Sequence, residues 1–417
     1  MGLIILSIII YVGSFYVSKR KDFFQPEAFL NLYFIVLIGI GPIALFFFSQ
    51  EMFDSQHYQE VIVIVLLGYV SINIGYYLAS GVKFKALHTA KNKLDHRISE
   101  KLSKKNFKAT SYIFIVLGLI CAFIFYIRAG GVPMLQKNKE VARTAALAVG
   151  GNGYFLYLMT TAMYGVALFA IYTFHYKTNN LKLFLIFGIV AIVMTGTGSR
   201  RYLLWLCLYI LISRHYIIKA LATKVMVFFS FLGLLFVNLF EMYRNPNSAT
   251  TTDLGTAFMF RFVLYISNLE KVISAFISKN TFEYGTTFYM DIITALPGKQ
   301  LDYQSWLKQV THLEFEGFGI PPTLMGDLYV NFGYPGIIIG CVIFGFGIRK
   351  LYNNLIVKGK SLSNIFLYIV SLEIASKIIT SGISSQSVSI VWLWIFLFMY
   401  KSVNTILTPS SAYVYSY

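Results

Sequence analysis

Charged residues are scarce in this chain: only 13% of its 417 residues are Asp, Glu, Lys or Arg. A soluble domain carries about 25% of them, so the charges present are too few to hydrate the surface of a water-soluble fold of this size. Hydrophobic residues make up 57% of the chain, which excludes an intrinsically disordered protein. The composition therefore predicts a polytopic membrane protein, with lipid in contact with most of its surface.

Several motifs of soluble enzymes are also missing. The sequence contains no GxxxxGK[S/T] phosphate loop, no HExxH and no GxSxG, which argues against ATP hydrolysis, zinc peptidases and serine hydrolases. It has no Asp-x-Asp pair, which often holds the metal of nucleotide-sugar glycosyltransferases. Cys121, Cys207 and Cys341 lie inside apolar runs and are expected to be small core residues. We therefore expect neither a cofactor nor a bound metal.

Apolar runs long enough for a membrane-spanning helix, about 20 residues, recur along the whole chain. We predict eleven transmembrane helices, near residues 2–17, 28–49, 58–80, 109–128, 153–174, 181–197, 202–218, 222–240, 325–347, 361–380 and 386–405. The sixth and seventh runs are short and closely linked, so a re-entrant pair is the alternative there. Together the runs predict an all-α helical bundle that forms a single membrane domain, residues 1–417.

The distribution of Lys and Arg predicts the orientation of the chain, because cytoplasmic loops carry an excess of positive charge. Most basic residues of the short connections lie on one side, for example in 18–26, 81–108 and 349–360, whereas the connections around Asp54 and Ser384, on the other side, have none. The N-terminus is therefore expected outside and the C-terminus in the cytoplasm. The basic cytoplasmic loop 81–108 lacks interleaved aromatic residues, so we expect it to contact lipid headgroups and not nucleic acid.

Two segments on the outer side are longer than a connection requires, and such loops usually have a function. The first outer loop is 129–152, and the large outer loop is 241–324. Within the second, apolar residues at helical spacing from Leu254 to Ile277 predict an amphipathic helix on the membrane surface.

Arginines on the outer side form a candidate anion site. Arg200 and Arg201 follow the sequence Thr195-Gly-Thr-Gly-Ser at a membrane boundary, where a cation is costly unless an anion meets it. Glycine permits close backbone approach, and the planar guanidinium group suits phosphate oxygens. These features favour a site for a lipid-linked diphosphate, and the alternative is a pair of arginines that extend to the interface. Three further arginines on this side are candidates for the same site: Arg143, Arg244 and Arg261.

Carboxylates on the outer side are candidates for a catalytic base, which group transfer to a hydroxyl requires. Asp327 is the first candidate, because Gly326 and the start of a span would hold it at the interface, where desolvation tunes its pKa. An equally good alternative is that Asp327 is the N-cap of that span. Glu283 and Asp291 are the next candidates.

Two further groups of ionisable residues have structural alternatives. His312, Glu314 and Glu316 alternate, which is compatible with a metal site, but an exposed polar loop is the favoured interpretation. Glu373 and Lys377 are four residues apart inside a span and are expected to pair on one helix face. Buried ionisable residues in membranes are also functional candidates.

Four passages resemble the oligosaccharide repeat-unit polymerases of the O-antigen polymerase (Wzy) type. They are RAGGVPML (128–135), TGTGSRRYLLW (195–205), FEYGTTFYMDIITALP (282–297) and GIPPTLMGDLYVNFGYPG (319–336). The number of spans and the late, large outer loop are also similar. The resemblance implies a membrane glycosyltransferase of the GT-C class in the bacterial inner membrane.

The same resemblance implies a substrate and roles for the candidate residues. The enzyme would move a growing glycan from its undecaprenyl diphosphate onto a new undecaprenyl-diphosphate-linked oligosaccharide, within a pathway that includes a flippase and a chain-length regulator. Arg200 and Arg201, helped by the other candidate arginines, would hold the diphosphate, and one outer carboxylate would activate the acceptor hydroxyl. The donor carries its own leaving group, which agrees with the missing ATP and metal motifs.

Two other functions remain as alternatives. An O-antigen ligase has a similar arginine motif and uses the same donor but transfers glycan to lipid A core; such ligases usually have a histidine in the large outer loop, where this chain has His312. A flippase or transporter is expected to show internal repeats or several ionisable residues along its spans. The sequence shows no repeat and only one such pair, so this alternative ranks last.

Overall fold

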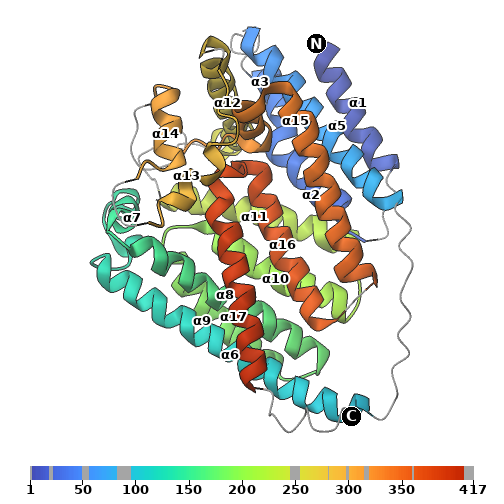
Figure 1. Cartoon of the computed structure of the whole chain (residues 1–417), viewed down its shortest axis with the longest axis vertical. Helices are drawn as coiled ribbons and strands as arrows, with labels where there is room; N and C mark the ends of the chain where they lie inside the picture. Colours follow the sequence, from blue (N-terminus) through green and yellow to red (C-terminus); the bar gives the residue numbers. More distant parts are fainter. Residues whose placement is uncertain are drawn as a thin grey trace. The chain divides into compact units, whose positions relative to one another are not determined.

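The computed structural model describes most of the chain, and every regular element in the described part is a helix (Figure 1). The described residues are 2–17, 22–48, 56–81, 95–244, 254–279, 281–296, 300–313, 319–358 and 361–407. This confirms the predicted all-α class.

Each of the predicted spans coincides with a helical segment. These segments are α1 (Gly2–Val17), α2 (Pro26–Phe34) continued by η1 (Ile35–Gly39) and α3 (Ile40–Phe48), α5 (Gln56–Gly81), α6 (Asp95–Arg128), α8 (Asn152–His175), α9 (Asn180–Thr195), α10 (Arg200–Ile217), α11 (Thr223–Arg244), α15 (Thr323–Tyr352), α16 (Leu362–Ser381) and α17 (Ser387–Leu407). Within the described residues, seven helices are long and apolar enough to cross a membrane. The polytopic membrane fold is thereby confirmed.

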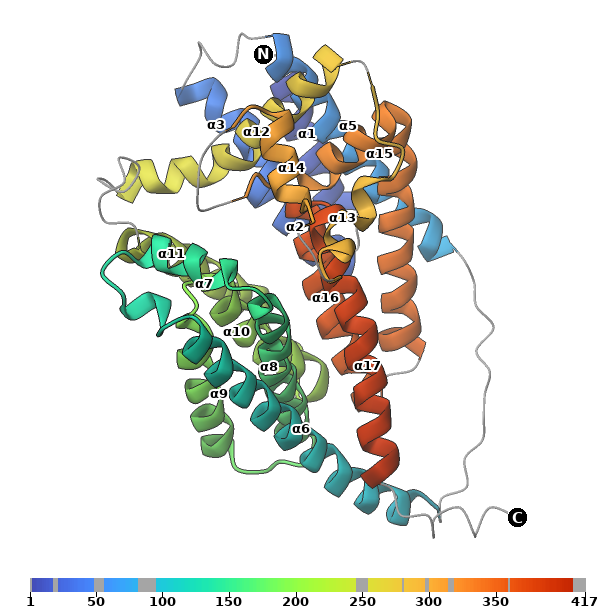
Figure 2. The same ribbon diagram turned by 60° about the vertical axis from the view of Figure 1, so that its left-hand side comes forward.

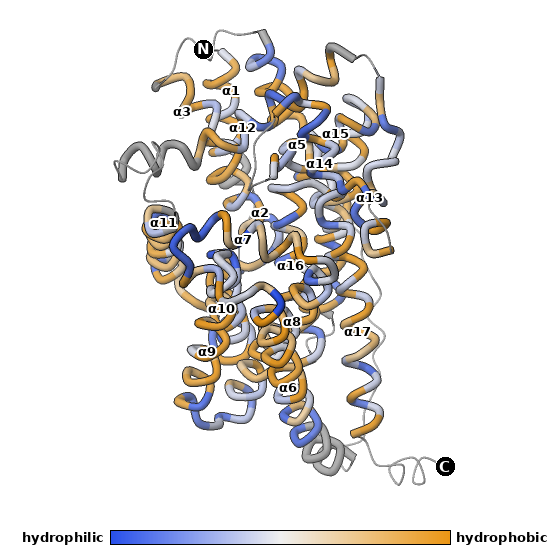
Figure 3. The backbone as a smooth tube through the Cα atoms, turned by 90° about the vertical axis from the view of Figure 1, so that its left-hand side faces the viewer, coloured by the Kyte–Doolittle hydropathy of each residue, from blue (hydrophilic) through white to orange (hydrophobic). Residues whose placement is uncertain are grey.

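The two segments predicted on the outer side, 129–152 and 241–324, also contain helices in their described parts. They contain η2 (Pro133–Leu135), α7 (Lys139–Ala148), α12 (Leu254–Lys279), α13 (Thr287–Ile293) and α14 (Tyr303–Val310). Two further short helices are η4 (Asn353–Lys358) and η5 (Ser384–Gln386). The predicted loop 81–108 is shorter than expected, because α6 already begins at Asp95, and 82–94 lie outside the described residues. Figure 3 shows α9 and α11 coloured mainly as hydrophobic residues, as a lipid environment requires.

Contacts divide the chain into two compact units, and the single membrane domain stays a prediction. Unit 1 comprises Met1–Phe84, Asn247–Lys360 and Ser371–Ile390, and unit 2 comprises Lys85–Pro246, Ser361–Val370 and Val391–Tyr417. The residues of α16 and α17 are shared between them.

Unit 1 is built around the pair α5 and α15, which pack backbone to backbone. A Cβ atom at Gly345 would lie 2.2 Å from the carbonyl oxygen of Ile72, and one at Gly75 would lie 2.2 Å from that of Val342. Small residues at such crossings are typical of helix association in membranes, where close packing replaces the hydrophobic effect.

Unit 2 is built around α8, which contacts α6, α9 and α10; Figure 2 shows α6, α8 and α9 side by side. Glycines again set the closest approach. A Cβ atom at Gly118 would lie 2.3 Å from the backbone nitrogen of Ala162, and one at Gly165 would lie 2.9 Å from the carbonyl oxygen of Ser111. The α6–α8 pair therefore also depends on small residues.

The amphipathic segment predicted near Leu254–Ile277 is α12, and other helices of unit 1 cover its apolar face. Ile266, Leu269, Ile273 and Phe276 are buried, and α12 contacts α3, α5 and α15 within unit 1. Helical spacing identifies the apolar face of a helix, but it does not say whether lipid or protein covers that face.

Connections that the charge pattern assigned to one side also meet in space. In unit 1, Arg349 forms an ion pair with Glu27 at 2.7 Å, and the Tyr352 hydroxyl donates to Asp22 at 2.9 Å. The first connection and the one after α15 therefore share one end of the unit. Cys121 and Cys341 are buried as predicted, but Cys207 is exposed.

Candidate functional site

The loop between α9 and α10 in unit 2 carries Arg200 and Arg201. Gly198 in this loop has a φ of 84°, a left-handed conformation that glycine adopts without strain. Thr197 is buried, and its hydroxyl donates to the Met194 carbonyl at 2.8 Å. The loop is therefore a defined turn that presents the first residues of α10.

The end of α6 and the predicted first outer loop, 129–152, both contact this turn. The backbone N–H of Met134 donates to the Gly196 carbonyl at 3.1 Å, and the Tyr126 hydroxyl donates to the Val193 carbonyl. A Cβ atom at Gly196 would lie 2.8 Å from the Tyr126 hydroxyl oxygen, so this position requires glycine. These contacts join two of the passages that carry the family resemblance, 128–135 and 195–205.

Arg143 of α7 lies against the same turn. Its Cδ atom would be 3.1 Å from a Cβ atom at Gly198, and its Nη2 is 2.5 Å from Glu140 Oε1. Arg200 is half-buried and Arg201 is exposed at the start of α10. The structure thus gathers three of the five candidate arginines in one place.

The end of α11 joins this group through Lys139. Its Nζ donates to the Tyr243 carbonyl at 3.2 Å and lies 4.1 Å from the centre of the Tyr243 ring. Arg244, the last residue of α11, directly follows Tyr243, whose carbonyl accepts this hydrogen bond from α7. Arg261 is on α12 in unit 1. The side chains of Arg244 and Arg261 lie outside the described part of the structure.

We call Lys139, Arg143, Arg200 and Arg201 the basic cluster. Glu140 forms an ion pair with Arg143 of this cluster. Four cationic side chains on two neighbouring segments suit a ligand with more than one negative charge.

Asp327 in unit 1 is fully buried inside α15. Its Oδ1 accepts hydrogen bonds from the hydroxyls of Tyr303 at 3.0 Å and Ser384 at 2.6 Å. Its Oδ2 accepts from the backbone N–H groups of Ile383 at 2.7 Å and Ser384 at 2.9 Å. Asp327 therefore caps the connection between α16 and α17. The prediction that it caps its own helix is wrong, because the N-cap of α15 is Pro322.

A kink in α15 follows Asp327. Gly333 has φ 64° and ψ −152°, and Pro335 has no N–H to offer the Asn331 carbonyl one turn earlier. The outer segment supplies the missing donors. The Tyr284 N–H donates to the Asn331 carbonyl and the Glu283 N–H to the carbonyl before it, both at 3.0 Å. The kink thus anchors the segment that carries Glu283.

The side chain of Asn331 extends this connection. Its Oδ1 accepts from the Gly285 N–H at 2.9 Å, and its Nδ2 donates to the Thr287 hydroxyl at 2.7 Å. The Ser384 hydroxyl donates to Asp327, so the Thr287 hydroxyl, 2.7 Å from it, is the donor to Ser384. The resemblance passages 282–297 and 319–336 are therefore joined by a buried polar network.

Glu283 and Asp291 lie beside this network and are both half-buried. Glu283 Oε2 accepts from the Thr286 hydroxyl at 3.1 Å, and Asp291 Oδ1 accepts from the Tyr303 N–H at 2.8 Å. Burial raises the pKa of Asp291 to about 6, although the bond from Tyr303 lowers it. Tyr303 links Asp291 to Asp327. We call Glu283, Asp291 and Asp327 the carboxylate cluster.

The structure describes three of the other ionisable candidates, His312, Glu373 and Lys377. His312 is exposed just after α14, and Glu314 and Glu316 lie outside the described residues. Glu373 and Lys377 form the predicted ion pair at 2.5 Å within α16. Among the described residues, no group of three His, Cys, Asp or Glu side chains is arranged to hold a metal.

The sequence analysis missed Tyr303, Thr287, Asn331 and Ser384, which hold the carboxylate cluster. Asn331 had a local signal, because it lies four residues before Pro335 and its carbonyl must find another donor. The other three have no such signal, since their partners are distant in the chain.

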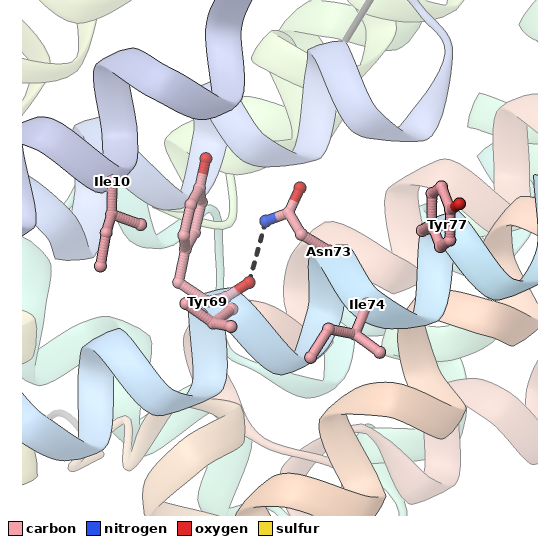
Figure 4. A pocket seen from close by; sticks show the side chains of 6 residues that line it. Ile10, Tyr69, Asn73, Ile74 and Tyr77 are labelled. Carbon is pink, nitrogen blue, oxygen red and sulfur yellow. Dashed lines mark hydrogen bonds between the residues drawn. The ribbon is translucent and has the colours of Figure 1, made fainter. Parts of the chain in front are cut away.

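Two cavities in unit 1 are apolar. The smaller, about 260 Å³, lies between α1 and α5 (Figure 4); Asn73 in its wall already donates to the Tyr69 carbonyl and accepts from Asn31. The larger, about 660 Å³, follows the kink of α15 and is lined by apolar residues that include Phe288, Phe332 and Ile383. Neither offers a charged group, so each suits hydrocarbon.

The family model described as "Putative O-antigen polymerase" matches residues 22–393, most of the chain. This chain belongs to the O-antigen polymerase family. No curated protein and no solved structure matches it. Membership of the O-antigen polymerase family confirms the resemblance seen in the sequence and assigns the chain a role in O-antigen polymerisation. It also implies a lipid-linked oligosaccharide substrate and, together with the apolar helices, a multi-pass protein of the inner membrane.

Proposed function

We propose that this O-antigen polymerase acts at the outer face of the inner membrane, with its N-terminus outside and its C-terminus in the cytoplasm. It transfers the growing glycan from undecaprenyl diphosphate to a new undecaprenyl-diphosphate-linked repeat unit. The observation that carries this proposal is the basic cluster, in which Arg143 packs against the Gly198 turn that precedes Arg200 and Arg201.

The basic cluster binds the diphosphate of the donor. Guanidinium groups donate paired hydrogen bonds to phosphate oxygens, and the start of α10 carries the positive end of a helix dipole. Negative charge grows on the diphosphate as the glycosidic bond breaks, so cations that are already in place lower the barrier. Arg244, the last residue of α11, and Arg261 on α12 remain candidates for diphosphate binding.

The carboxylate cluster activates the acceptor hydroxyl. Asp291 is the preferred base, since a pKa of about 6 leaves it ionised at neutral pH yet basic enough to accept a proton. Glu283 is the second candidate. Asp327 was the first candidate from sequence, but its two oxygens accept four hydrogen bonds, and we assign it the role of holding the site together.

The apolar cavity along α15 supports a lipid-linked substrate. It runs beside Phe288 of α13, the helix that carries Asp291 one turn later. A substrate with a polyprenyl chain and a polar head combines the two chemistries found there.

Deletion of the gene, followed by gel analysis of the surface glycan, tests the function. If the protein is a polymerase, deletion should remove the ladder of long chains and leave lipid A core that carries a single repeat unit. Complementation with Arg200→Ala should leave this defect, while the intact gene restores the ladder. Loss of every repeat unit on deletion would instead identify a ligase or a flippase and would refute the proposal.

A further inference from the structure

Tyr284 combines two properties that cost free energy. Its side chain is 76% exposed, and its backbone has a φ of 49°, a left-handed conformation that is strained for a residue with a Cβ atom. Burial of the ring therefore does not explain why tyrosine occupies this position. Gly285, the next residue, has a φ of 90° without strain.

The kink of α15 forces this conformation on Tyr284. Three consecutive N–H groups, of residues 283, 284 and 285, donate to the Val330 carbonyl, the Asn331 carbonyl and Asn331 Oδ1 at 3.0, 3.0 and 2.9 Å. The Asn331 carbonyl needs this donor because Pro335 has none. Glycine at 284 would satisfy the same hydrogen bonds with less strain, so the turn itself does not require the aromatic ring.

The groups that flank the ring in sequence have the chemistry to recognise a carbohydrate. The Glu283 carboxylate precedes the ring and is half-buried, and the exposed ring of Tyr289 follows on α13. An aromatic face matches the apolar C–H face of a sugar ring, while carboxylate oxygens accept hydrogen bonds from its hydroxyls. An adjacent carboxylate is unfavourable for insertion into lipid, which favours a sugar over the membrane as the partner.

We propose that the exposed Tyr284 ring stacks on a sugar ring of the lipid-linked repeat unit, with Glu283 bonded to its hydroxyls. This inference rests on the proposed function and adds the residue that positions the saccharide. The stacking role also accounts for the strained backbone at Tyr284, because the kink of α15 fixes the direction in which the ring extends from the chain.

The test uses purified full-length protein in phospholipid vesicles and lipid-linked repeat units isolated from cells that lack the gene. Tyr284→Leu removes the aromatic face and should raise KM about tenfold while kcat changes less than about twofold. Tyr284→Phe keeps the face and should leave KM within about twofold of the intact protein.

Tyr284→Gly separates stability from binding. Glycine relieves the backbone strain, so the unfolding temperature should rise, while KM should increase as in the leucine variant. A purely structural role for Tyr284 predicts the reverse, a lower unfolding temperature and an unchanged KM. That result would overturn the inference.

Tyr77 provides the matched control. It is 78% exposed on α5 of the same unit, at the edge of the smaller apolar cavity (Figure 4). Tyr77→Leu should leave KM unchanged. Equal effects of Tyr77→Leu and Tyr284→Leu would identify both as membrane-interface tyrosines and refute the stacking role.

Failure of this inference is distinguishable from failure of the proposed function. If the intact protein forms no polymer in vesicles and gene deletion leaves the glycan ladder unchanged, the function is wrong. If the intact protein forms polymer and Tyr284→Leu does so with the same KM, only the role of Tyr284 is wrong.

Discussion

The basic cluster of unit 2 and the carboxylate cluster of unit 1 are built in similar ways but differ in burial. In each, an outer segment is hydrogen-bonded to a break in helical structure, the Gly196–Gly198 turn in one and the Gly333–Pro335 kink in the other. Arg201 at the first break is exposed, whereas Asp327 near the second is fully buried. The first cluster is suited to meet a charged ligand, whereas Asp327 in the second is suited to hold a segment in place.

This difference predicts the largest effect on stability at Asp327. Asp327→Ala leaves four donors without their acceptor in a buried site, and the free energy of unfolding should fall by roughly 4 kcal/mol. Thermal unfolding of the purified protein measures the change. Asp291→Ala, which removes the acceptor of the Tyr303 N–H at a half-buried site, is the control and should cost less. Equal losses for the two variants would contradict the special role of Asp327 in holding the carboxylate cluster together.

The basic cluster should show the opposite behaviour, a large effect on activity with little effect on stability. Arg143→Ala should lower the polymerisation rate about 100-fold, as expected for loss of a group that stabilises developing charge. Arg128 is the matched control within unit 2, because it donates to the Gly150 carbonyl at 2.6 Å and packs over the Phe155 ring. Arg128→Ala should lower the unfolding temperature, but it should reduce the polymerisation rate much less than Arg143→Ala does. A normal rate in a folded Arg143→Ala protein would contradict the assignment.

The turn that carries the basic cluster should be sensitive to a single methyl group. Gly198→Ala places a Cβ atom in a left-handed residue and 3.1 Å from Arg143 Cδ, which should cost roughly 2 kcal/mol. Gly188, inside α9 with no atom within 4 Å of a Cβ position, is the control. Gly188→Ala should be neutral or stabilising. Unfolding temperatures that rank the two variants in the other order would show that the turn is not constrained.

The smallest expected change in stability concerns Asp291 and depends on pH. Its pKa of about 6 in the folded protein exceeds the value of about 3.9 in an unfolded chain, so folding favours the protonated form. This contribution to stability is complete below pH 4 and is lost as pH rises through 6. Asp291→Asn should therefore be more stable than the intact protein above pH 6, by roughly 1 kcal/mol.

The activity of the intact protein should show the reverse dependence. A base must be ionised to accept a proton, so the polymerisation rate should rise as pH increases through about 6 and then level off. Asp291→Asn should have lost this activity at every pH. A variant with the rate and pH profile of the intact protein would transfer the role of base to Glu283.

The spans could be predicted from sequence because a helix of about 20 apolar residues matches the thickness of the hydrocarbon layer. The arginine turn could be predicted because its glycines and arginines are adjacent. The surroundings of Asp327 could not, because its partners Ile383 and Ser384 follow it by more than 50 residues and carry no local signal. What covers the apolar face of α12 could not be predicted either, because an apolar stripe does not identify the neighbour that packs against it.

The central claim, that the basic cluster binds the diphosphate of the donor, is tested most directly by binding of undecaprenyl diphosphate to the purified protein. The account predicts tighter binding of the diphosphate than of undecaprenyl monophosphate, and a loss of about tenfold or more in Arg143→Ala and Arg200→Ala but not in Arg128→Ala. Equal affinity for the two lipids, or equal affinity in all three variants, would contradict it.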